Sequence, residues 1–328
     1  MKSYSIRRIS QFFIALALLI GMATSAVAND VLIRIDGQQL TIAGDDDGNF
    51  LTFRVNGAGD PFILSLRGTT INGTSTRFNL RDADITSVVM FMRGGNDVVI
   101  IRNVSLSSNG SATPVMWYDG GSGNNRFVAR GVAGESFFDG SVRLDGGSDN
   151  DFIDISDYLV TGDVDIRGEL GRDRVDIQAS QALGQLSIVT GRGLSFVELD
   201  DVVADNLVVT GGRDINRFKF FNVSATTIEI LTGISRDLLT MQSISSNSVS
   251  VDLDNGRDDA LLDSFLVGVF ILDCGPDNDF VAATNIQTSM PSSGMPSLLN
   301  GSFGTRDTLL IDSASRAFVE IESFEIQD

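Results

Sequence analysis

Three stretches decide the fold: "VELDDVVADNLVV" at 197–209, "FKFFNVSATTIEI" at 218–230 and "LTMQSISSNSVSV" at 239–251. Each stretch begins 21 residues after the previous one, and apolar residues recur at the same places in all three. Within a stretch, apolar and polar residues alternate, and this period of two is typical of a β-strand with one buried face. We therefore expect each copy to stack directly on the copy before it.

The same apolar row continues through the chain, with steps of 21 to 28 residues between most of its members. Its members are Leu51, Phe78, Val99, Phe127, Ile153, Val175, Val197, Phe218, Leu239, Ala260, Val281 and Leu309. Stacked copies of this length predict an all-β fold, a right-handed single-stranded parallel β-helix (solenoid) of about eleven coils. We expect one domain over 29–328, with 29–60 as the N-terminal cap and first coil and 315–328 as the C-terminal cap.

The first 28 residues have the pattern of a secretory signal peptide. A basic start is followed by a short apolar core and by small residues at Ala26–Ala28, as expected before a cleavage site. The apolar run is short for a spanning helix, so we expect no membrane insertion of the mature chain. The sequence predicts an exported protein that is periplasmic, attached to the cell surface or extracellular.

Composition narrows the function classes. The net charge of the chain is −19, and it becomes −22 once the signal peptide removes three basic residues, so nucleic acid is an unfavourable partner. The absence of histidine excludes catalysis that needs an imidazole and zinc sites with histidine ligands. The single cysteine, Cys274, cannot form an internal disulfide. We expect a protein that is not an enzyme.

Two polar rows follow the same repeat. The first row comprises Asn103, Asp157, Asp201, Asn222, Ser243, Ser264 and Asn285. Small polar side chains of this kind are typical of tight corners, where they bond to the backbone and to the equivalent residue one coil away. The apolar residues that flank the row favour a structural role and argue against exposure.

The second polar row lies two residues before the apolar row, and glycines precede most of its members. These members are Asp97, Asn125, Asp151, Asp173, Ser195, Asn216, Asp237, Asp258, Asp279 and Asp307. Stacking would bring their carboxylates about 5 Å apart, where like charges repel. Either the neighbouring Arg172, Arg213, Arg236 and Arg257 pair with them, as expected for solvated turns, or calcium does, with six to eight oxygen ligands.

Two of these turns, "GGSDNDFID" at 146–154 and "CGPDNDFVA" at 274–282, resemble the hemolysin-type calcium-binding nonapeptide. The resemblance implies calcium as a cofactor, although the glycine before the second acid is replaced in both. The candidate ligands are Asp149, Asp151, Asp277, Asp279, Asp97 and Asp173.

Further resemblances concern fold and export. The coil length is similar to that of right-handed β-helices of the pectate-lyase type. The stretches Leu40–Leu51, Gly68–Gly73 and Arg93–Asp97 resemble a group of exported bacterial repeat proteins, which implies fold and export and no particular chemistry.

The remaining candidate is Trp117 in "VMWYDGG". Its neighbours align with inward rows, so Trp117 points outward, where it can stack on a sugar, contact a partner or lie over adjacent side chains. We expect an exported β-solenoid that acts as a surface or extracellular binding or structural protein, with a polysaccharide or a cell-surface component as partner. The alternative is a polysaccharide-binding or polysaccharide-lyase-type β-helix. The sequence leaves the oligomeric state open.

Overall fold

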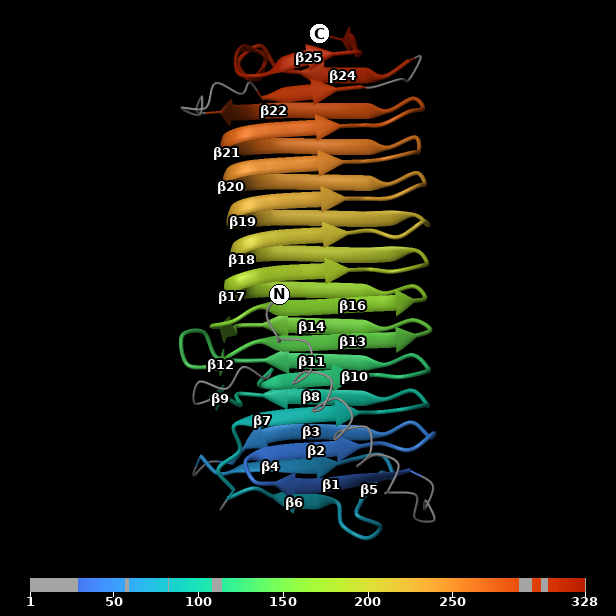
Figure 1. Cartoon of the computed structure of the whole chain (residues 1–328), viewed down its shortest axis with the longest axis vertical. Coiled ribbons are helices and arrows are strands. Elements are labelled where there is room, and N and C mark those ends of the chain that lie inside the picture. The colour runs from blue at the N-terminus through green and yellow to red at the C-terminus, as the bar shows by residue number, and fades with distance from the viewer. Residues whose placement is uncertain are drawn as a thin grey trace, which may run out of the picture.

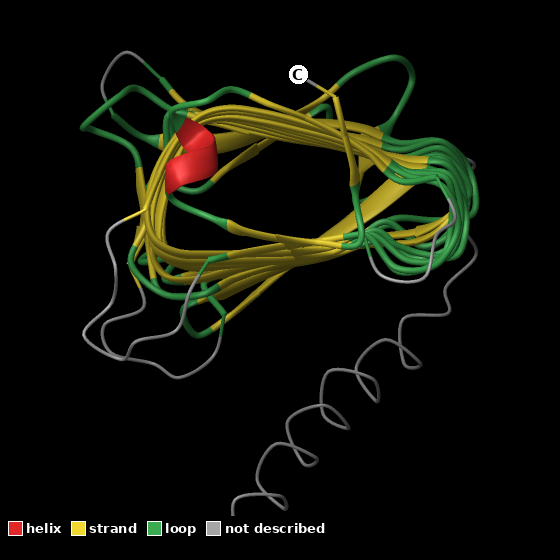
Figure 2. Cartoon of the chain, turned by 90° about the horizontal axis from the view of Figure 1, so that it is seen from above, coloured by secondary structure: helices red, strands yellow, loops and turns green. Residues whose placement is uncertain are grey.

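The chain folds as a parallel β-solenoid of about nine turns, and strands make up 63% of the residues that the structure describes. This computed structural model describes residues 29–56, 59–81, 83–107, 114–288, 297–301 and 306–327. Figure 1 shows the strands stacked along the long axis. Seen along that axis, two long, flattened sides meet at one narrow end in a column of superposed turns (Figure 2). The predicted signal peptide, 1–28, lies outside the described residues.

The strands fall into three groups along the chain. The N-terminal group is β1 (Asp30–Asp36), β2 (Gln39–Ala43), β3 (Phe50–Val55), β4 (Pro61–Ser65), β5 (Thr70–Ile71), β6 (Arg77–Asn79), β7 (Ser87–Phe91), β8 (Val98–Arg102) and β9 (Leu106–Ser107). The middle group is β10 (Met116–Asp119), β11 (Arg126–Arg130), β12 (Phe137–Asp139), β13 (Val142–Ser148), β14 (Phe152–Ser156), β15 (Leu159–Val160), β16 (Val164–Leu170), β17 (Arg174–Val189), β18 (Ser195–Thr210) and β19 (Asn216–Leu231). The C-terminal group is β20 (Leu238–Asp252), β21 (Asp259–Asp273), β22 (Phe280–Thr288), β23 (Leu298–Asn300), β24 (Thr308–Ile311), β25 (Glu320–Glu322) and β26 (Glu325–Gln327).

The long strands β17 to β21 confirm the predicted stacking. Val197 pairs in parallel register with Val175 on one side and with Phe218 on the other, and Phe218 pairs with Leu239. The side chains of these residues are at most 1% exposed. Each buried apolar side chain of this size contributes roughly 1.5–3 kcal/mol, so the repeated row forms a continuous core.

The first polar row forms the corners of the coils. Residues Asn103, Asp157, Asp201, Asn222, Ser243, Ser264 and Asn285 all have positive φ angles, between 52° and 61°. Asparagine, aspartate and serine are among the residues that tolerate or favour such turn positions, which explains their recurrence. The prediction of a tight corner is confirmed, but the expected burial is wrong, since Asp201, Asn222 and Ser243 are exposed.

The N-terminal part differs from the predicted repeat. Strands β1 and β2 pair antiparallel, as do β3 and β4, and β4 and β6. Phe78 therefore lies in an antiparallel excursion, and Leu51 of β3 stacks directly against Val99 of β8. This excursion replaces one of the expected coils, and the solenoid has about nine turns, slightly fewer than the eleven expected from residue spacing.

The C-terminal end carries a short 3-10 helix, Ser315–Ala317. The Ser315 Oγ accepts a hydrogen bond of 2.8 Å from the backbone N–H of Ile286 in β22, and the Asp312 carboxylate accepts one of 2.8 Å from the N–H of Asn285. These two side chains therefore satisfy N–H groups at the edge of the last long strands, as an open strand edge requires. Strands β25 and β26 continue the parallel stacking on β23 and β24.

Candidate functional site

The second polar row lies inside the solenoid, at the column of turns. Its members Asp97, Asn125, Asp151, Asp173, Ser195, Asn216, Asp237, Asp258, Asp279 and Asp307 are at most 4% exposed. The interpretation of this row as solvated turns paired with arginine is therefore wrong. The glycines before each acid let the chain reverse tightly, so that the following side chain turns inward under the turn.

A hydrogen-bond ladder runs along this row. The backbone N–H of Asp151 donates to the Oδ1 of Asp173 at 3.0 Å, and the N–H of Asp258 donates to the Oδ1 of Asp279 at 2.8 Å. The same bond joins Asn49 to Asp97, Asp97 to Asn125, Asn125 to Asp151, Asn216 to Asp237, Asp237 to Asp258 and Asp279 to Asp307. Each accepting side chain thus satisfies a backbone N–H of the preceding coil, and the ladder is interrupted at Ser195, whose own N–H donates to the Ile215 carbonyl.

The asparagine copies use their second polar atom as a donor. The Nδ2 of Asn125 donates to the carbonyl of Gly123 at 2.9 Å, and the Nδ2 of Asn216 donates to the carbonyl of Asp214 at 2.7 Å. In both copies the acceptor lies two residues earlier in the same turn. The Ser195 hydroxyl bonds to the Gly193 carbonyl in the same way at 3.3 Å. At this place in the coil, a side-chain hydrogen-bond donor therefore satisfies the carbonyl two residues earlier.

The aspartate copies place an oxygen where asparagine has this donor. The Oδ2 atoms of Asp97, Asp151, Asp173, Asp237, Asp258 and Asp279 are buried and have no hydrogen-bond partner among the described residues. A buried, unpaired oxygen is costly when it carries charge. A bound proton or a cation would each provide the missing contact.

Burial also shifts the protonation of these groups. Loss of solvent raises the pKa of Asp258 to about 8, and it raises that of Asp237 to about 6, although the hydrogen bonds that each carboxyl accepts oppose the rise. The pKa values of Asp97, Asp151, Asp173 and Asp279 are raised to about 7, mainly by the same burial. Part of the row is therefore neutral at physiological pH.

The two acids in each calcium-type turn are close in sequence, but the structure places one outside the turn and the other inside. Asp149 and Asp277 are exposed, with φ angles of 81° and 96°, whereas Asp151 and Asp279 are buried beneath the same turns. The Oδ2 of Asp149 accepts a hydrogen bond of 3.0 Å from the N–H of Gly123. Within the described residues, no three acidic or cysteine side chains lie close enough together to share a metal ion. Any calcium here would need turn carbonyls for most of its ligands.

The arginines beside the row form no ion pair with its buried acids in the described part of the chain. Arg236 forms an ion pair of 2.7 Å with Asp259, which faces outward from β21. The backbone N–H of Arg172 donates to Asn150, at the end of an exposed asparagine ladder that links Asn96, Asn124 and Asn150. Among the described residues, no ion pair joins these arginines to the buried acids, because the row is inside and these side chains start from the outside of the turns. Arg257 is still near enough for its charge to lower the pKa of Asp279, against the larger rise that burial causes.

Trp117 lies half-buried on β10 and faces outward. Its ring meets Phe91 of β7 edge-on at 5.3 Å between centroids, and the guanidinium of Arg143 in β13 lies 5.5 Å from the ring centre. The Trp117 ring therefore contacts outward side chains of its own face, Phe91 in the preceding coil and Arg143 in the next. A role in binding a partner or a sugar stays a prediction.

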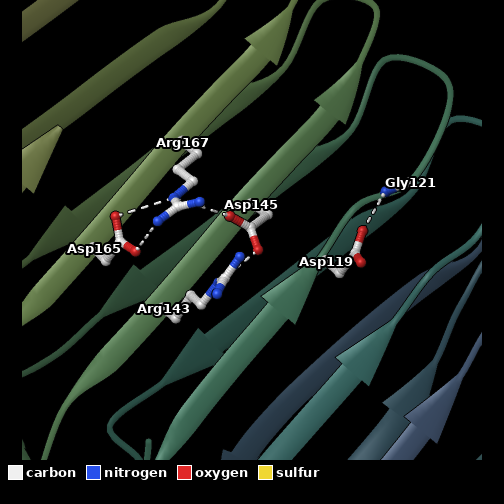
Figure 3. A network of polar contacts seen from close by, with 6 residues as sticks. All are labelled: Asp119, Gly121, Arg143, Asp145, Asp165 and Arg167. Atoms are coloured by element: carbon white, nitrogen blue, oxygen red, sulfur yellow. Dashed lines mark hydrogen bonds and ion pairs between the residues drawn. The ribbon is translucent and has the colours of Figure 1, made fainter. Parts of the chain in front are cut away.

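Next to Trp117, acids and arginines alternate on the outer surface of the same face. Arg143 pairs with Asp145 at 2.8 Å, and Arg167 pairs with Asp165 at 2.9 Å and reaches Asp145 at 3.9 Å (Figure 3). Asp119, one coil away, accepts a hydrogen bond from the N–H of Gly121, and burial, then the nearby Asp145, raises its pKa. These charges largely satisfy one another.

A second outer surface was not predicted from the sequence. On β3, β8, β11 and β14, the outward residues include four exposed arginines and one acid, namely Arg54, Arg102, Arg126, Arg130 and Asp154. We call this surface the arginine face. Its signal is the recurring final arginine of "FLTFR", "VVIIR" and "RFVAR", but those positions come into register only when the antiparallel excursion between β3 and β8 is known.

The arginine face continues as an alternating row of arginine and phenylalanine. Arg126, Phe152, Arg174, Phe196 and Arg217 are direct neighbours in successive coils. The guanidinium carbons lie 5.0 Å (Arg126) and 6.0 Å (Arg174) from the Phe152 ring centre, and that of Arg217 lies 5.5 Å from Phe196. These are cation–π distances, so each phenylalanine orders the arginines beside it.

Comparisons with known proteins do not extend this description: no protein family model matches the chain, and no curated protein or solved structure matches it. Among the described residues, no helix has the length and apolar character needed to cross a membrane.

Proposed function

We propose that the protein is an exported β-solenoid that acts outside the cytoplasm as a binding or structural protein and not as an enzyme. The observation that carries this proposal is the parallel register from β8 to β24, which repeats each outward side-chain position at one coil spacing, about 4.8 Å, with one shift between Ala182 and Gln185. Such a surface offers the same contact many times along one axis, as repeat proteins do when they bind extended partners.

Export is supported by the basic start, the short apolar core and the small residues at Ala26–Ala28. The test is to express the full chain with a C-terminal tag in a bacterium, to separate the cytoplasmic, periplasmic and secreted fractions, and to determine the N-terminal residue. We expect a mature protein that begins at Asn29, outside the cytoplasm. Retention in the cytoplasm with residues 1–28 uncleaved would contradict export.

Calcium at the acidic turns is a second element of the proposal. The unpaired, buried Oδ2 atoms of Asp151 and Asp279 favour it, since carboxylate and turn carbonyl oxygens are the ligands that calcium prefers. The test compares thermal unfolding in calcium with unfolding in EDTA, for the natural chain and for a variant with both Asp151→Asn and Asp279→Asn. Calcium binding predicts a rise in Tm of several degrees that the variant loses. An unchanged Tm would remove calcium from the proposal.

A polysaccharide-cleaving β-helix is the alternative function. It is favoured by ion pairs on the continuation of the arginine face, where Arg174 binds Asp176 at 2.8 Å and Arg130 binds Asp154 at 3.1 Å. A lyase would produce unsaturated sugars from polygalacturonate or alginate, which absorb in the ultraviolet. An increase in absorbance with the natural chain would replace the binding proposal by this one.

A further inference from the structure

We infer that the arginine face binds a linear anionic polysaccharide along the solenoid axis. This inference rests on the proposed binding function and adds the face, the residues and the chemical class of the ligand. The outward residues of β3, β8, β11 and β14 that carry it are Arg54, Arg102, Arg126, Arg130, Ile100 and Phe152.

The charge of this face is opposite to that of the molecule. The whole chain has a net charge of −19, yet the outward positions of these four strands hold four arginines against Asp154 alone. Arg54, Arg102 and Arg130 pair in register in three consecutive coils. Like charges stacked about 4.8 Å apart repel one another, and an anionic ligand would relieve this repulsion.

Three of these arginines, Arg54, Arg102 and Arg126, have no acidic partner in the described part of the chain. Arg130 pairs with Asp154 at 3.1 Å, and Arg54 lies over the Phe62 ring at 5.1 Å. Arg102 and Arg126 form no ion pair with any described residue, and both are exposed. Their guanidinium groups are therefore available to bind carboxylate or sulfate in the bidentate geometry that arginine favours.

The apolar side chains that reach the surface beside the arginines are those of Ile100 and Phe152, both half-buried. Val128, in register with Ile100, is 2% exposed and lies beneath this surface. Phe152 is half-buried, with the guanidinium of Arg126 5.0 Å from its ring centre. An apolar strip flanked by cations suits a sugar ring, whose C–H face packs on apolar and aromatic groups while its acidic substituent reaches an arginine.

The regular spacing favours a polymer over a small ion, because one coil after another presents the same group. A polysaccharide with one acidic group for each sugar or pair of sugars matches a spacing of one or two coils. Nucleic acid is also a regular anionic polymer, so DNA serves as a comparison polymer in the test.

The test measures binding of the mature chain to immobilised polygalacturonate, with neutral dextran and single-stranded DNA as comparison polymers. The first variant is Arg102→Gln alone, which removes an exposed charge without breaking an ion pair. The second combines it with Arg54→Gln and Arg126→Gln. The matched control removes the same charge from the turns through Arg192→Gln, Arg213→Gln and Arg257→Gln, all exposed residues.

We expect polygalacturonate binding that weakens as salt is added, about tenfold or more weaker binding by the triple face variant, and a partial loss with Arg102→Gln. The control should stay within about twofold of the natural chain. The inference is overturned if the natural chain does not bind, if the control loses as much as the face variant, or if DNA binds as tightly as polygalacturonate. Export and calcium dependence are measured separately, so these outcomes leave the proposed function standing.

Discussion

Replacing Asp258 by asparagine is the sharpest test of the buried acidic row. In the natural chain, the Asp258 Oδ1 accepts a hydrogen bond from the N–H of Asp237, and its Oδ2 has no partner among the described residues. An asparagine would keep the first bond through its carbonyl oxygen. Its amide would supply the donor that Asn216 already provides in the same place, 2.7 Å from the Asp214 carbonyl.

The magnitude follows from the pKa of Asp258, which burial raises to about 8, against about 3.9 in an unfolded chain. Because the folded value is the higher one, the stabilisation carried by the neutral carboxyl is complete below about pH 4 and is lost as the pH rises through 8. The difference between the folded and unfolded pKa values corresponds to about 5 kcal/mol of unfolding free energy at pH 8. Since Asp237 and Asp279 titrate beside it, we expect about 2–4 kcal/mol from the single substitution.

The assay is urea unfolding at pH 4.5 and at pH 8, followed by circular dichroism. At pH 4.5 the Asp258→Asn variant and the natural chain should agree within about 1 kcal/mol, and at pH 8 the variant should be the more stable. The control is Asp254→Asn, at an exposed acid of the same turn. If the difference between Asp258→Asn and the natural chain does not change with pH, or if the variant is less stable at pH 8, the reasoning about a neutral acid is wrong.

Three further substitutions or reagents test the stacking. Phe218→Ala should cost about 3–5 kcal/mol of unfolding free energy, because that ring is 1% exposed, whereas Phe196→Ala, at a half-buried outward position, should cost less than half as much in the same urea assay. Gly121→Ala should destabilise the fold by about 2–3 kcal/mol, since its Cβ would lie 1.9 Å from the Arg93 carbonyl oxygen. The control Gly134→Ala, with a similar positive φ but open space around it, should cost about 1 kcal/mol. Equal losses in the two variants would contradict the close approach of coils. Burial raises the pKa of the Cys274 thiol, so a thiol reagent should modify it only after unfolding, and rapid labelling of the folded chain would show that this coil is open.

The sequence was sufficient for the fold wherever the repeat is regular. From Val197 to Val281, constant steps of 21 residues place the members of each apolar row in one stack, and the observed register follows these steps. The count of coils failed at Phe78, which has the right spacing but belongs to an antiparallel hairpin. Spacing alone does not distinguish a coil from a hairpin of equal length, because both return an apolar residue to the same face.

The candidate site was less predictable for a related reason. The row that contains Asp151 and Asp279 was predicted from the sequence, but its side chains were expected to face solvent because acids are rarely buried without partners. A glycine-rich turn reverses the direction of the next side chain, and the residue pattern does not carry that information. The arginine face was not predicted from the sequence, since Arg54 and Arg102 are 48 residues apart and become neighbours only through the pairing of β3 with β8.

Proton binding and calcium binding at the buried acidic row have opposite consequences for stability at pH 8, so a stability measurement can tell which of the two the acids bind. If protons fill the place beside the Oδ2 of Asp258, calcium at pH 8 leaves the natural chain less stable than Asp258→Asn, because no ion replaces the lost proton. If calcium fills it, added calcium stabilises the natural chain at pH 8 by mass action and has less effect on the variant, which lacks the charged ligand. The asparagines at 125 and 216 already show that the fold needs no charge at this place. An ionisable group retained at Asp258 and its neighbours is therefore best explained by a response to pH or to calcium, and urea unfolding at pH 8 with and without calcium separates the two.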